Sequence, residues 1–236
     1  MPVKRGSSGR RMLEVFEAVA ASQPIGVSAL ARLLEADKSA VQRDLMTLAD
    51  AGWIRAAQSG WELTPRILTL ARTPHSSNDL RQRARPVLEA LRSSTGETTY
   101  LTVPDGENFV VIDALESPQV LRTVPPIGLV VPTRGSATAR AVLPYMGAAE
   151  QRRLLGADPT KELLDQFAHT RLLGFAVNDG DIVAGAVAIA SAILDTGDRP
   201  LGALVVTAPA ERLDQERRER IGLQLVEAVR TLGSEM

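Results

Sequence analysis

The feature that most constrains the fold is one block, residues 37–65, with the sequence DKSAVQRDLMTLADAGWIRAAQSGWELTP. Asp37 is a typical N-cap and Gly52 a typical helix stop, so the block predicts a helix between them. Inside it, Val41, Leu45 and Leu48 follow the i, i+4, i+7 spacing of a buried helix face. The residues that follow predict a short hairpin, 53–56 with 60–63, joined by residues 57–59.

Two shorter helical patterns precede this block. The first covers residues 10–22 and ends near Pro24, and the second follows Ser28, which is expected to be its N-cap. A turn at residues 35–37 then leads into the third helix. Two helices joined by a three-residue turn predict a helix-turn-helix, and the hairpin makes it winged. The apolar residues expected to pack the first two helices are Leu13, Phe16, Val19, Ala20, Leu30, Leu33 and Leu34.

The outward face of the third helix is polar and cationic. Gln and Arg side chains on such a face reach base edges in the major groove, and a Lys or an amide at the helix start holds a phosphate. Arg55 and Gln58 are expected on the wing. The alternative is a protein-interaction or dimerisation module, and we favour DNA binding because the exposed face is not apolar. The predicted DNA-binding residues are Lys38, Ser39, Gln42, Arg43 and Arg55.

Charge is unevenly distributed along the 236 residues. Residues 1–72 hold ten Lys or Arg against seven Asp or Glu, a net +3, whereas residues 73–236 are net −4. This asymmetry favours a polyanionic partner for the N-terminal part. The apolar run at 182–194 is shorter than the ~20 residues of a membrane-spanning helix, and no secretory pattern opens the chain. With no cysteine present, we expect a cytoplasmic protein without disulfides or membrane contact.

The rest of the chain predicts an α+β fold in which a central antiparallel sheet has helices around it. Arg81, Arg83 and Arg85 are interpreted as a solvated helix face or as further phosphate contacts. The predicted organisation is a flexible basic arm at 1–9, a winged helix-turn-helix at 10–72, a linker with a linker helix at 73–95 and a ligand-binding domain at 96–236. The expected strands are 98–103, 109–115, 119–124, 184–194 and 200–208, and the expected helices are 136–143, 148–155, 160–173 and 211–232.

No motif in the sequence predicts catalysis. The two histidines, His75 and His169, lie in unlike contexts, and neither HExxH, GxSxG nor GxxxxGK[ST] occurs. Ser136 starts a helix without an evident general base, so capping is its expected role, and residues 178–182 read as a polar turn. We therefore expect no enzyme activity, no cofactor and no metal. The alternative is a small-molecule-binding enzyme or sensor domain whose helix-turn-helix serves only dimerisation.

Four segments of the second part carry a family resemblance. They are RARPVLEALRSSTGETTYLTVPDGENFVVIDALESPQVLR, VPTRGSATARAVLP, LLGFAVNDGDIVAGAVAIASAI and LGALVVTAPAERL. Their order and spacing, behind a winged helix-turn-helix, resemble the IclR family of bacterial transcriptional regulators over nearly the whole chain. The resemblance implies a GAF-like effector-binding domain, and a homodimer or homotetramer that binds a pseudopalindromic operator as a repressor or activator.

The resemblance also implies an effector pocket. The family commonly has His at Arg134, Gly-Lys at Ala139-Arg140 and Cys at Ala188, so this pocket is expected to be more apolar with one added cation. From these departures we predict a small organic acid with an apolar or aromatic body, held by Arg134 or by amides at Ser136. A surface ion pair for Arg134, and plain strand core for Ala188 and Val205, are the alternatives. The implied pocket residues are Val131, Arg134, Ser136, Ala137, Thr138, Asn178, Ala186, Ala188, Val205 and Thr207.

Overall fold

The computed structural model describes residues 7–71 and 76–233. The chain divides into two compact units, Met1–Pro74 and His75–Met236. The predicted linker helix is α5, Ser76–Thr95, and it belongs to the second unit because its apolar face packs into that unit's core. No helix within the described ranges is long and apolar enough to cross a membrane.

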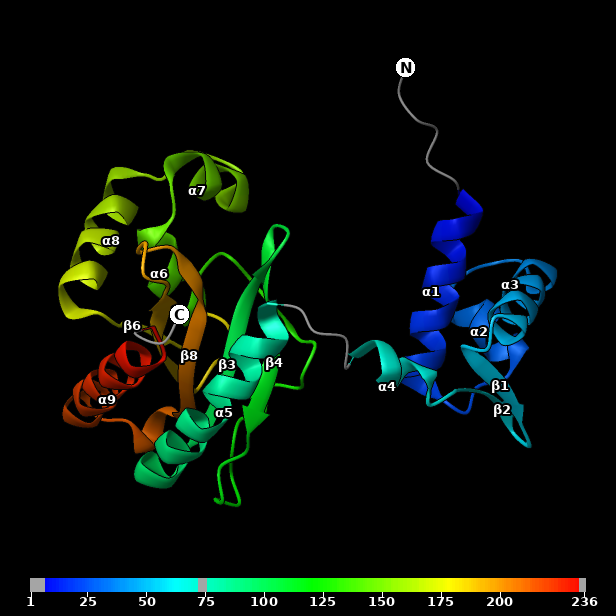
Figure 1. Ribbon diagram of the computed structural model, residues 1–236, viewed down its shortest axis with the longest axis horizontal. Coiled ribbons are helices and arrows are strands. Elements are labelled where there is room, and N and C mark those ends of the chain that lie inside the picture. The colour runs from blue at the N-terminus through cyan, green and yellow to red at the C-terminus, as the bar shows by residue number, and fades with distance from the viewer. Residues whose placement is uncertain (1–6, 72–75, 234–236) are drawn as a thin grey trace. The chain divides into compact units, whose positions relative to one another are not determined.

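The first unit is a three-helix bundle with a two-stranded hairpin (Figure 1). Its core collects Val15 and Val19 from the first helix, Leu30 from the second and Leu45 from the third, all fully buried. The rings of Trp53 and Phe16 make an edge-to-face contact with centroids 6.0 Å apart, which attaches the hairpin to the bundle. The elements are α1 Ser7–Ser22, α2 Val27–Leu33, α3 Lys38–Asp50, β1 Ile54–Ala57, β2 Gly60–Leu63 and α4 Arg66–Ala71.

Several predictions for this unit need correction. Helix α1 begins at Ser7, so residues 7–9 are helical and only residues 1–6 of the predicted arm lie outside the described range. Helix α2 begins one residue before Ser28, and Gly26 occupies its N-cap without a side-chain bond. Leu33 is 58% exposed because the buried stripe of α2 follows positions 27, 30, 31 and 34. Leu13, 62% exposed, and Ala20 also face outward, because the buried stripe of α1 follows positions 12, 15, 16, 18 and 19.

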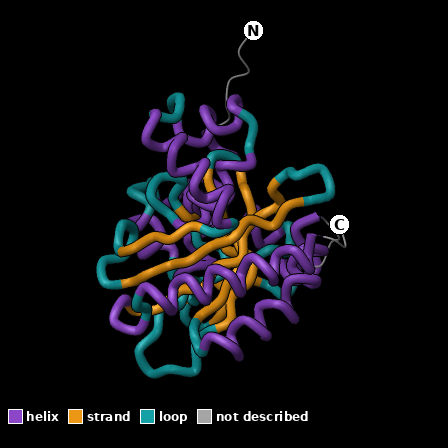
Figure 2. Tube along the Cα trace, turned by 90° about the vertical axis from the view of Figure 1, so that its left-hand side faces the viewer, coloured by secondary structure: helices purple, strands orange, loops and turns teal. Residues whose placement is uncertain are grey.

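The second unit is built on a six-stranded antiparallel sheet of order β5-β4-β3-β8-β7-β6 (Figures 1 and 2). Alternation along each strand divides its side chains between two faces. On β8, Leu204 and Val206 pack against α5 and α9, while Ala203 and Val205 face the opposite core under α6. The strands are β3 Thr98–Asp105, β4 Asn108–Leu115, β5 Val130–Val131, β6 Ala176–Asp179, β7 Ala186–Leu194 and β8 Pro200–Pro209.

The helices of this unit follow the predicted pattern closely. Thr160 caps α8 through its hydroxyl, which accepts from the Leu163 amide at 3.2 Å. The final helix starts four residues later than predicted, because a short 3-10 turn at Ala210–Arg212 precedes it. The helices after α5 are α6 Ala137–Val142, η1 Leu143–Tyr145, α7 Ala148–Leu155, α8 Lys161–Leu173, η2 Ala210–Arg212 and α9 Gln215–Gly233.

The strand predicted at 119–124 is wrong. That segment is a loop, and Val120 is 97% exposed. Two consecutive prolines, Pro125 and Pro126, interrupt any strand pairing directly after it. Its backbone bonds side chains instead of a neighbouring strand: the Leu121 carbonyl accepts from Arg212, and the Gln119 amide donates to Ser117. A two-residue strand, β5, forms farther on instead.

Two arginines of α5, Arg81 and Arg85, pair with the sheet, a role different from the solvated face or the phosphate contacts predicted from the sequence. Arg85 donates to Asp113 at 2.9 Å and Arg81 lies 3.5 Å from the same carboxylate, which is 2% exposed. Because Asp113 lies on β4, these pairs attach α5 to the sheet. Arg81 and Arg85 are therefore neither a purely solvated face nor free for phosphate.

Candidate functional site

The start of α3 is fixed by Asp37. Its carboxylate accepts from the Ala40 amide at 2.9 Å and from the Ser39 hydroxyl at 2.5 Å. The Ser39 hydrogen bond, followed by that of Ala40, lowers the pKa of Asp37, so the cap is ionised at neutral pH. The predicted N-cap is confirmed, and it sets where the first turn of α3 presents its side chains.

The inward face of α3 is held by packing and by one ion pair. Val41, Leu45 and Leu48 are buried as predicted. Asp44, 5% exposed, accepts from Arg11 of α1 through both oxygens, at 2.6 and 3.3 Å. This bidentate contact fixes the rotation of α3 about its axis relative to α1.

The outward face of α3 gathers four of the five predicted DNA-binding residues. Lys38, Ser39, Gln42 and Arg43 are all exposed and share one side of the helix. The Arg43 guanidinium donates to the Ser39 hydroxyl at 3.3 Å, so these two side chains lie together one turn apart. The face can present an amide group and two cations to a groove.

The fifth predicted residue, Arg55, lies on the wing with a partner of its own. Arg55 is directly opposite Glu62 in the β1–β2 ladder, and its Nε lies 2.7 Å from the Glu62 carboxylate. The arginine is exposed, and the glutamate is half-buried. Sequence reasoning missed Glu62, because the predicted three-residue loop shifts the hairpin register by one residue.

The predicted effector residues mostly share one face of the sheet in the second unit. The register places Ala188 between Asn178 on β6 and Thr207 on β8, and Val205 beside Tyr100 of β3. Thr138 of α6 covers this face, with its hydroxyl 3.4 Å from that of Thr102. The face combines small apolar positions with a few polar side chains, which suits a small ligand.

The turn before α6 joins the same face. Ser136 caps the helix by accepting from the Ala139 amide at 3.1 Å, which confirms the expected capping role. The Asn178 side chain donates to the Gly135 carbonyl, and Gly135 has a φ of +82°, a conformation that favours glycine. Asn178 therefore connects β6 to this turn through its side chain.

Arg134, for which a ligand clamp and a surface ion pair were the two alternatives, lies at the surface. Its side chain is exposed and donates to the Leu155 carbonyl at 2.9 Å, at the C-terminal end of α7 where helix carbonyls attract cations. It lines a cavity of about 320 Å³ with Asp158 and Thr160. The other nine predicted residues line neither this cavity nor the larger one below, among the described residues.

Several residues near the face were missed. Tyr100, Thr98 and Thr102 lie on it by strand alternation, and burial raises the pKa of the Tyr100 hydroxyl. Arg140, noted only as a departure from the family, donates to the Val177 carbonyl at 2.8 Å and to Asp181 at 2.6 Å. Extending the alternation of the predicted strand at 98–103 would have found the first three.

A second hollow lies between α8 and α9. It measures about 1160 Å³, and His169 lines it together with Lys161 and Arg218. The other histidine, His75, is outside the described residues. Among the described residues, no group of three or more His, Cys, Asp or Glu side chains is placed to hold a metal ion.

These features define a class: a winged helix-turn-helix whose outward α3 face is polar and cationic, followed by an α+β unit with small apolar and polar side chains on one face of its sheet. A family model described as bacterial transcriptional regulator IclR C-terminal matches residues 73–234, and a second model, HVO_A0114, matches residues 9–68. The chain belongs to the IclR family of bacterial transcriptional regulators and is a ligand-responsive transcriptional regulator.

Named relatives and solved structures support this family assignment. The chain is 25% identical to the acetate operon repressor of Salmonella typhimurium, covering 93% of this chain and 86% of that protein. It is 29% identical to the glycerol operon regulatory protein of Streptomyces coelicolor, covering 87% and 85%. An IclR homologue from Microbacterium hydrocarbonoxydans, solved in complex with 4-hydroxybenzoate, superposes with a TM-score of 0.81 at 19% identity, covering 98% and 100%. The predicted fold class, with its GAF-like second domain, is confirmed, and these relatives are regulators rather than enzymes.

Proposed function

We propose that the first unit binds a pseudopalindromic operator as part of a homodimer or homotetramer in the bacterial cytoplasm. The observation that carries this is the outward face of α3, where Lys38, Ser39, Gln42 and Arg43 are exposed together. A helix in the major groove uses such groups to bond base edges and phosphates. Two-fold symmetry of the protein then requires a roughly two-fold symmetric site.

We further propose that the second unit senses a small organic acid with an aromatic or aliphatic body. Support comes from the sheet face, where Ala186, Ala188 and Val205 supply apolar surface and Thr138 and Thr207 supply hydroxyls. A protein with this fold was solved with 4-hydroxybenzoate, which makes this acid a rational first probe. The bound acid changes operator affinity by a coupling free energy of ~1–3 kcal/mol.

The first experiment selects bound sequences from a random DNA pool with the purified protein. A pseudopalindromic motif is expected, and Arg43→Ala should weaken the base preference at specific positions of this motif. Arg10→Ala is the matched control, because Arg10 is an exposed cation of α1 whose partner is Glu14 and which lies off the α3 face. Operator affinity should fall steeply with salt because bound phosphates release counterions. No enriched motif at low salt would favour the alternative, a helix-turn-helix used only for dimerisation.

The second experiment adds aromatic and aliphatic acids, beginning with 4-hydroxybenzoate, to the protein–operator complex. An active acid should change the binding isotherm by about 5-fold to 150-fold. Ala188→Leu should remove that response without changing operator affinity, because a larger side chain at a half-buried position fills the ligand face. Identical isotherms with every acid would contradict the sensing proposal.

The role of Arg134 is tested with the same active acid. Arg134 donates to Leu155 outside the sheet face, so Arg134→Ala should leave the half-effective concentration within about twofold of the wild type. A large loss of response would instead assign Arg134 to the ligand. This variant therefore distinguishes an acid bound at the sheet face from an acid bound in the cavity beside α7.

A further inference from the structure

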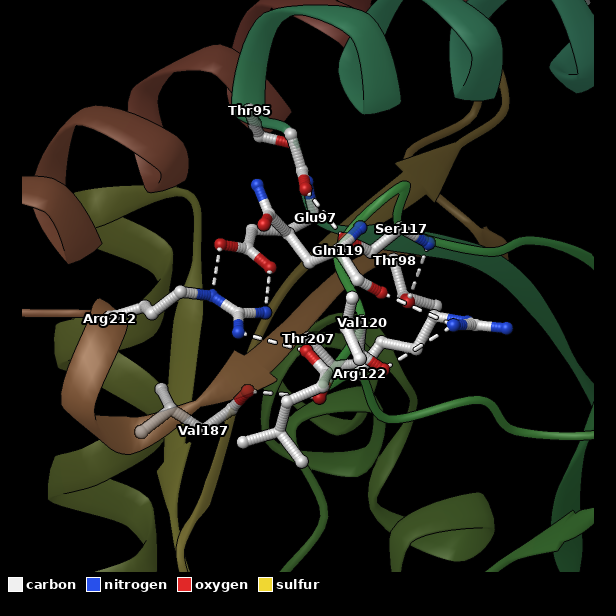
Figure 3. A network of polar contacts seen from close by, with 12 residues as sticks. Thr95, Glu97, Thr98, Ser117, Gln119, Val120, Arg122, Val187, Thr207 and Arg212 are labelled. Atoms are coloured by element: carbon white, nitrogen blue, oxygen red, sulfur yellow. Dashed lines mark hydrogen bonds and ion pairs between the residues drawn. The ribbon is translucent and has the colours of Figure 1, made fainter.

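A buried carboxylate, Glu97, lies directly before β3 and is 1% exposed. Arg212 of η2 holds it with two parallel hydrogen bonds, from Nε at 2.9 Å and from Nη2 at 2.6 Å (Figure 3). Arg217 of α9 adds one bond at 3.1 Å. A bidentate arginine–carboxylate contact fixes the plane and direction of the guanidinium, which a single bond does not.

The remaining edge of the Arg212 guanidinium points to a loop. Its Nη1 donates to the Leu121 carbonyl at 2.9 Å. We call residues 117–121 the crossing loop. Its other end is held by Ser117, whose amide donates to the Thr98 hydroxyl at 3.0 Å and whose own hydroxyl donates to the Gly96 carbonyl at 2.7 Å. Figure 3 shows Ser117 and Thr98 beside Gln119 and Val120 of this loop.

The crossing loop is held by these polar contacts rather than by a core of its own. Val120 is 97% exposed and Leu121 is 65% exposed, so their side chains bury little apolar surface. Ser117 is buried, and its hydroxyl also accepts from the Gln119 amide at 3.1 Å, so it holds the first half of the loop. Arg122 donates to the Gln119 and Val120 carbonyls at 3.2 and 3.5 Å, but these bonds stay within the segment and move with it. Among the described hydrogen bonds of residues 118–121, the Arg212 bond is the one that comes from another element, so it ties this end of the loop to η2.

The crossing loop lies at one end of the proposed ligand face. Thr98 is paired with Thr207 across β3 and β8, on the same face as Tyr100 and Val205. Thr98 is fully buried and Thr207 is 4% exposed. The loop that bonds Thr98 therefore lies beside a residue expected to meet the effector.

We infer that Arg212 is a positioning residue of the effector site: Glu97 fixes its guanidinium, and the guanidinium holds the crossing loop against the Thr98–Thr207 end of the ligand face. The inference rests on the proposed function insofar as that face binds the effector. Lysine cannot replace Arg212 in this role, because one ammonium cannot bond both carboxylate oxygens and the Leu121 carbonyl in a fixed plane.

Arg217 provides a matched control. It shares the Glu97 carboxylate, and it donates to the Thr95 and Arg212 carbonyls at 2.9 Å each. None of these three partners lies in the crossing loop. Arg217→Met and Arg212→Met therefore each remove one cation from Glu97, but only Arg212→Met removes the loop anchor.

The first test is limited trypsin digestion of the full chain, with cleavage after Arg122 followed by mass spectrometry. Arg122 is exposed and comes directly after the crossing loop, so a released loop gives the protease access. Arg212→Met should speed this cleavage about tenfold, the order expected for one lost hydrogen bond from a charged donor. Arg217→Met should change it less than about twofold. Equal acceleration in both variants would indicate general destabilisation and would overturn the inference, as would no acceleration in Arg212→Met.

The second test uses whichever acid changes operator binding by the wild-type protein, with 4-hydroxybenzoate as the first probe. Arg212→Met should raise the half-effective concentration about tenfold and leave ligand-free operator affinity unchanged, while Arg217→Met stays within about twofold. An unchanged concentration despite faster cleavage would refute the positioning role. If no acid acts on the wild type, the proposed sensing function fails, while the cleavage ratio still decides whether Arg212 anchors the loop.

Discussion

Removing the carboxylate of Glu62 should strengthen DNA binding, because it frees a cation on the wing. Arg55 Nε lies 2.7 Å from the Glu62 carboxylate, and the two side chains are 63% and 30% exposed. Two unit charges about 4 Å apart in water attract by about 1 kcal/mol, and measured exposed pairs give ~0.2–1 kcal/mol. Arg55 gives up this interaction when it turns to a phosphate, so Glu62→Gln should raise operator affinity by about 1.4-fold to 5-fold for each wing that contacts DNA.

The salt dependence gives a second, independent number. If free Arg55 gains one phosphate contact, the slope of log K against log salt should steepen by about 0.9 for each wing. Operator affinity is measured by fluorescence anisotropy of labelled DNA at several salt concentrations. Glu62→Gln should lower the free energy of unfolding by ~0.2–1 kcal/mol, because it removes an ion pair from the hairpin. Urea unfolding followed by tryptophan fluorescence measures this change, since Trp53 and Trp61 are the only tryptophans of the chain.

A double-mutant cycle makes the reasoning refutable. In an Arg55→Ala background, Glu62→Gln should give no added phosphate contact and no steeper salt slope. A gain of the same size in that background would show that Glu62 repels DNA directly and that Arg55 is not the freed group. No gain in the wild-type background, with the fold intact, would show that Arg55 does not reach DNA.

Two further predictions concern folding. Gly222 lies inside α9, where alanine would ordinarily be favoured by ~1 kcal/mol, but an added Cβ would lie 2.6 Å from the Phe175 ring. Gly222→Ala should therefore lower stability by ~1–3 kcal/mol in circular-dichroism melts, and a stabilised variant would contradict that contact. The Ser39 hydrogen bond lowers the pKa of Asp37 below its ordinary 3.8, so its stabilisation is present above that pH and is lost as the pH falls below it. Asp37→Asn keeps a capping oxygen, so it should reduce the loss of unfolding free energy below about pH 4, measured by tryptophan fluorescence. If the variant loses as much stability as the wild type over this pH range, Asp37 is not the cause of the loss.

The parts of the fold set by local pattern could be predicted from sequence. The faces of α3 follow from helical periodicity, because Val41 and Leu45 cannot both be buried unless Gln42 and Arg43 face outward. The N-cap at Asp37 follows from the bonding capacity of its side chain. Each of these depends on residues within two helical turns of one another.

A one-residue error in a turn was enough to hide the Arg55–Glu62 pair. A loop at 57–59 would place Arg55 opposite Trp61, whereas the observed two-residue loop places Arg55 opposite Glu62. Strand register changes every partner when it shifts by one residue. The predicted hairpin was therefore correct in kind and wrong in the one detail that concerns the wing cation.

The remaining misses depend on contacts between distant segments. For Arg134 the sequence left a carboxylate clamp and a surface ion pair open, and it gave no sign of its partner, the Leu155 carbonyl at the end of another helix. Glu97 gave no signal in the sequence, because its burial depends on Arg212, more than a hundred positions later. The alternation in residues 119–124 suggested a strand, yet no neighbouring strand pairs with it in the described sheet.

The strand order also bears on how the chain is made. The two central strands β3 and β8 pair directly although one begins at Thr98 and the other ends at Pro209. The first unit, by contrast, is complete once α4 has been synthesised. At ~5–20 residues per second, the roughly 140 residues between these points take about 7–28 s on the ribosome. A nascent chain therefore carries a folded DNA-reading unit for some seconds before its sensor sheet can close, and during that interval it has no means of responding to an effector.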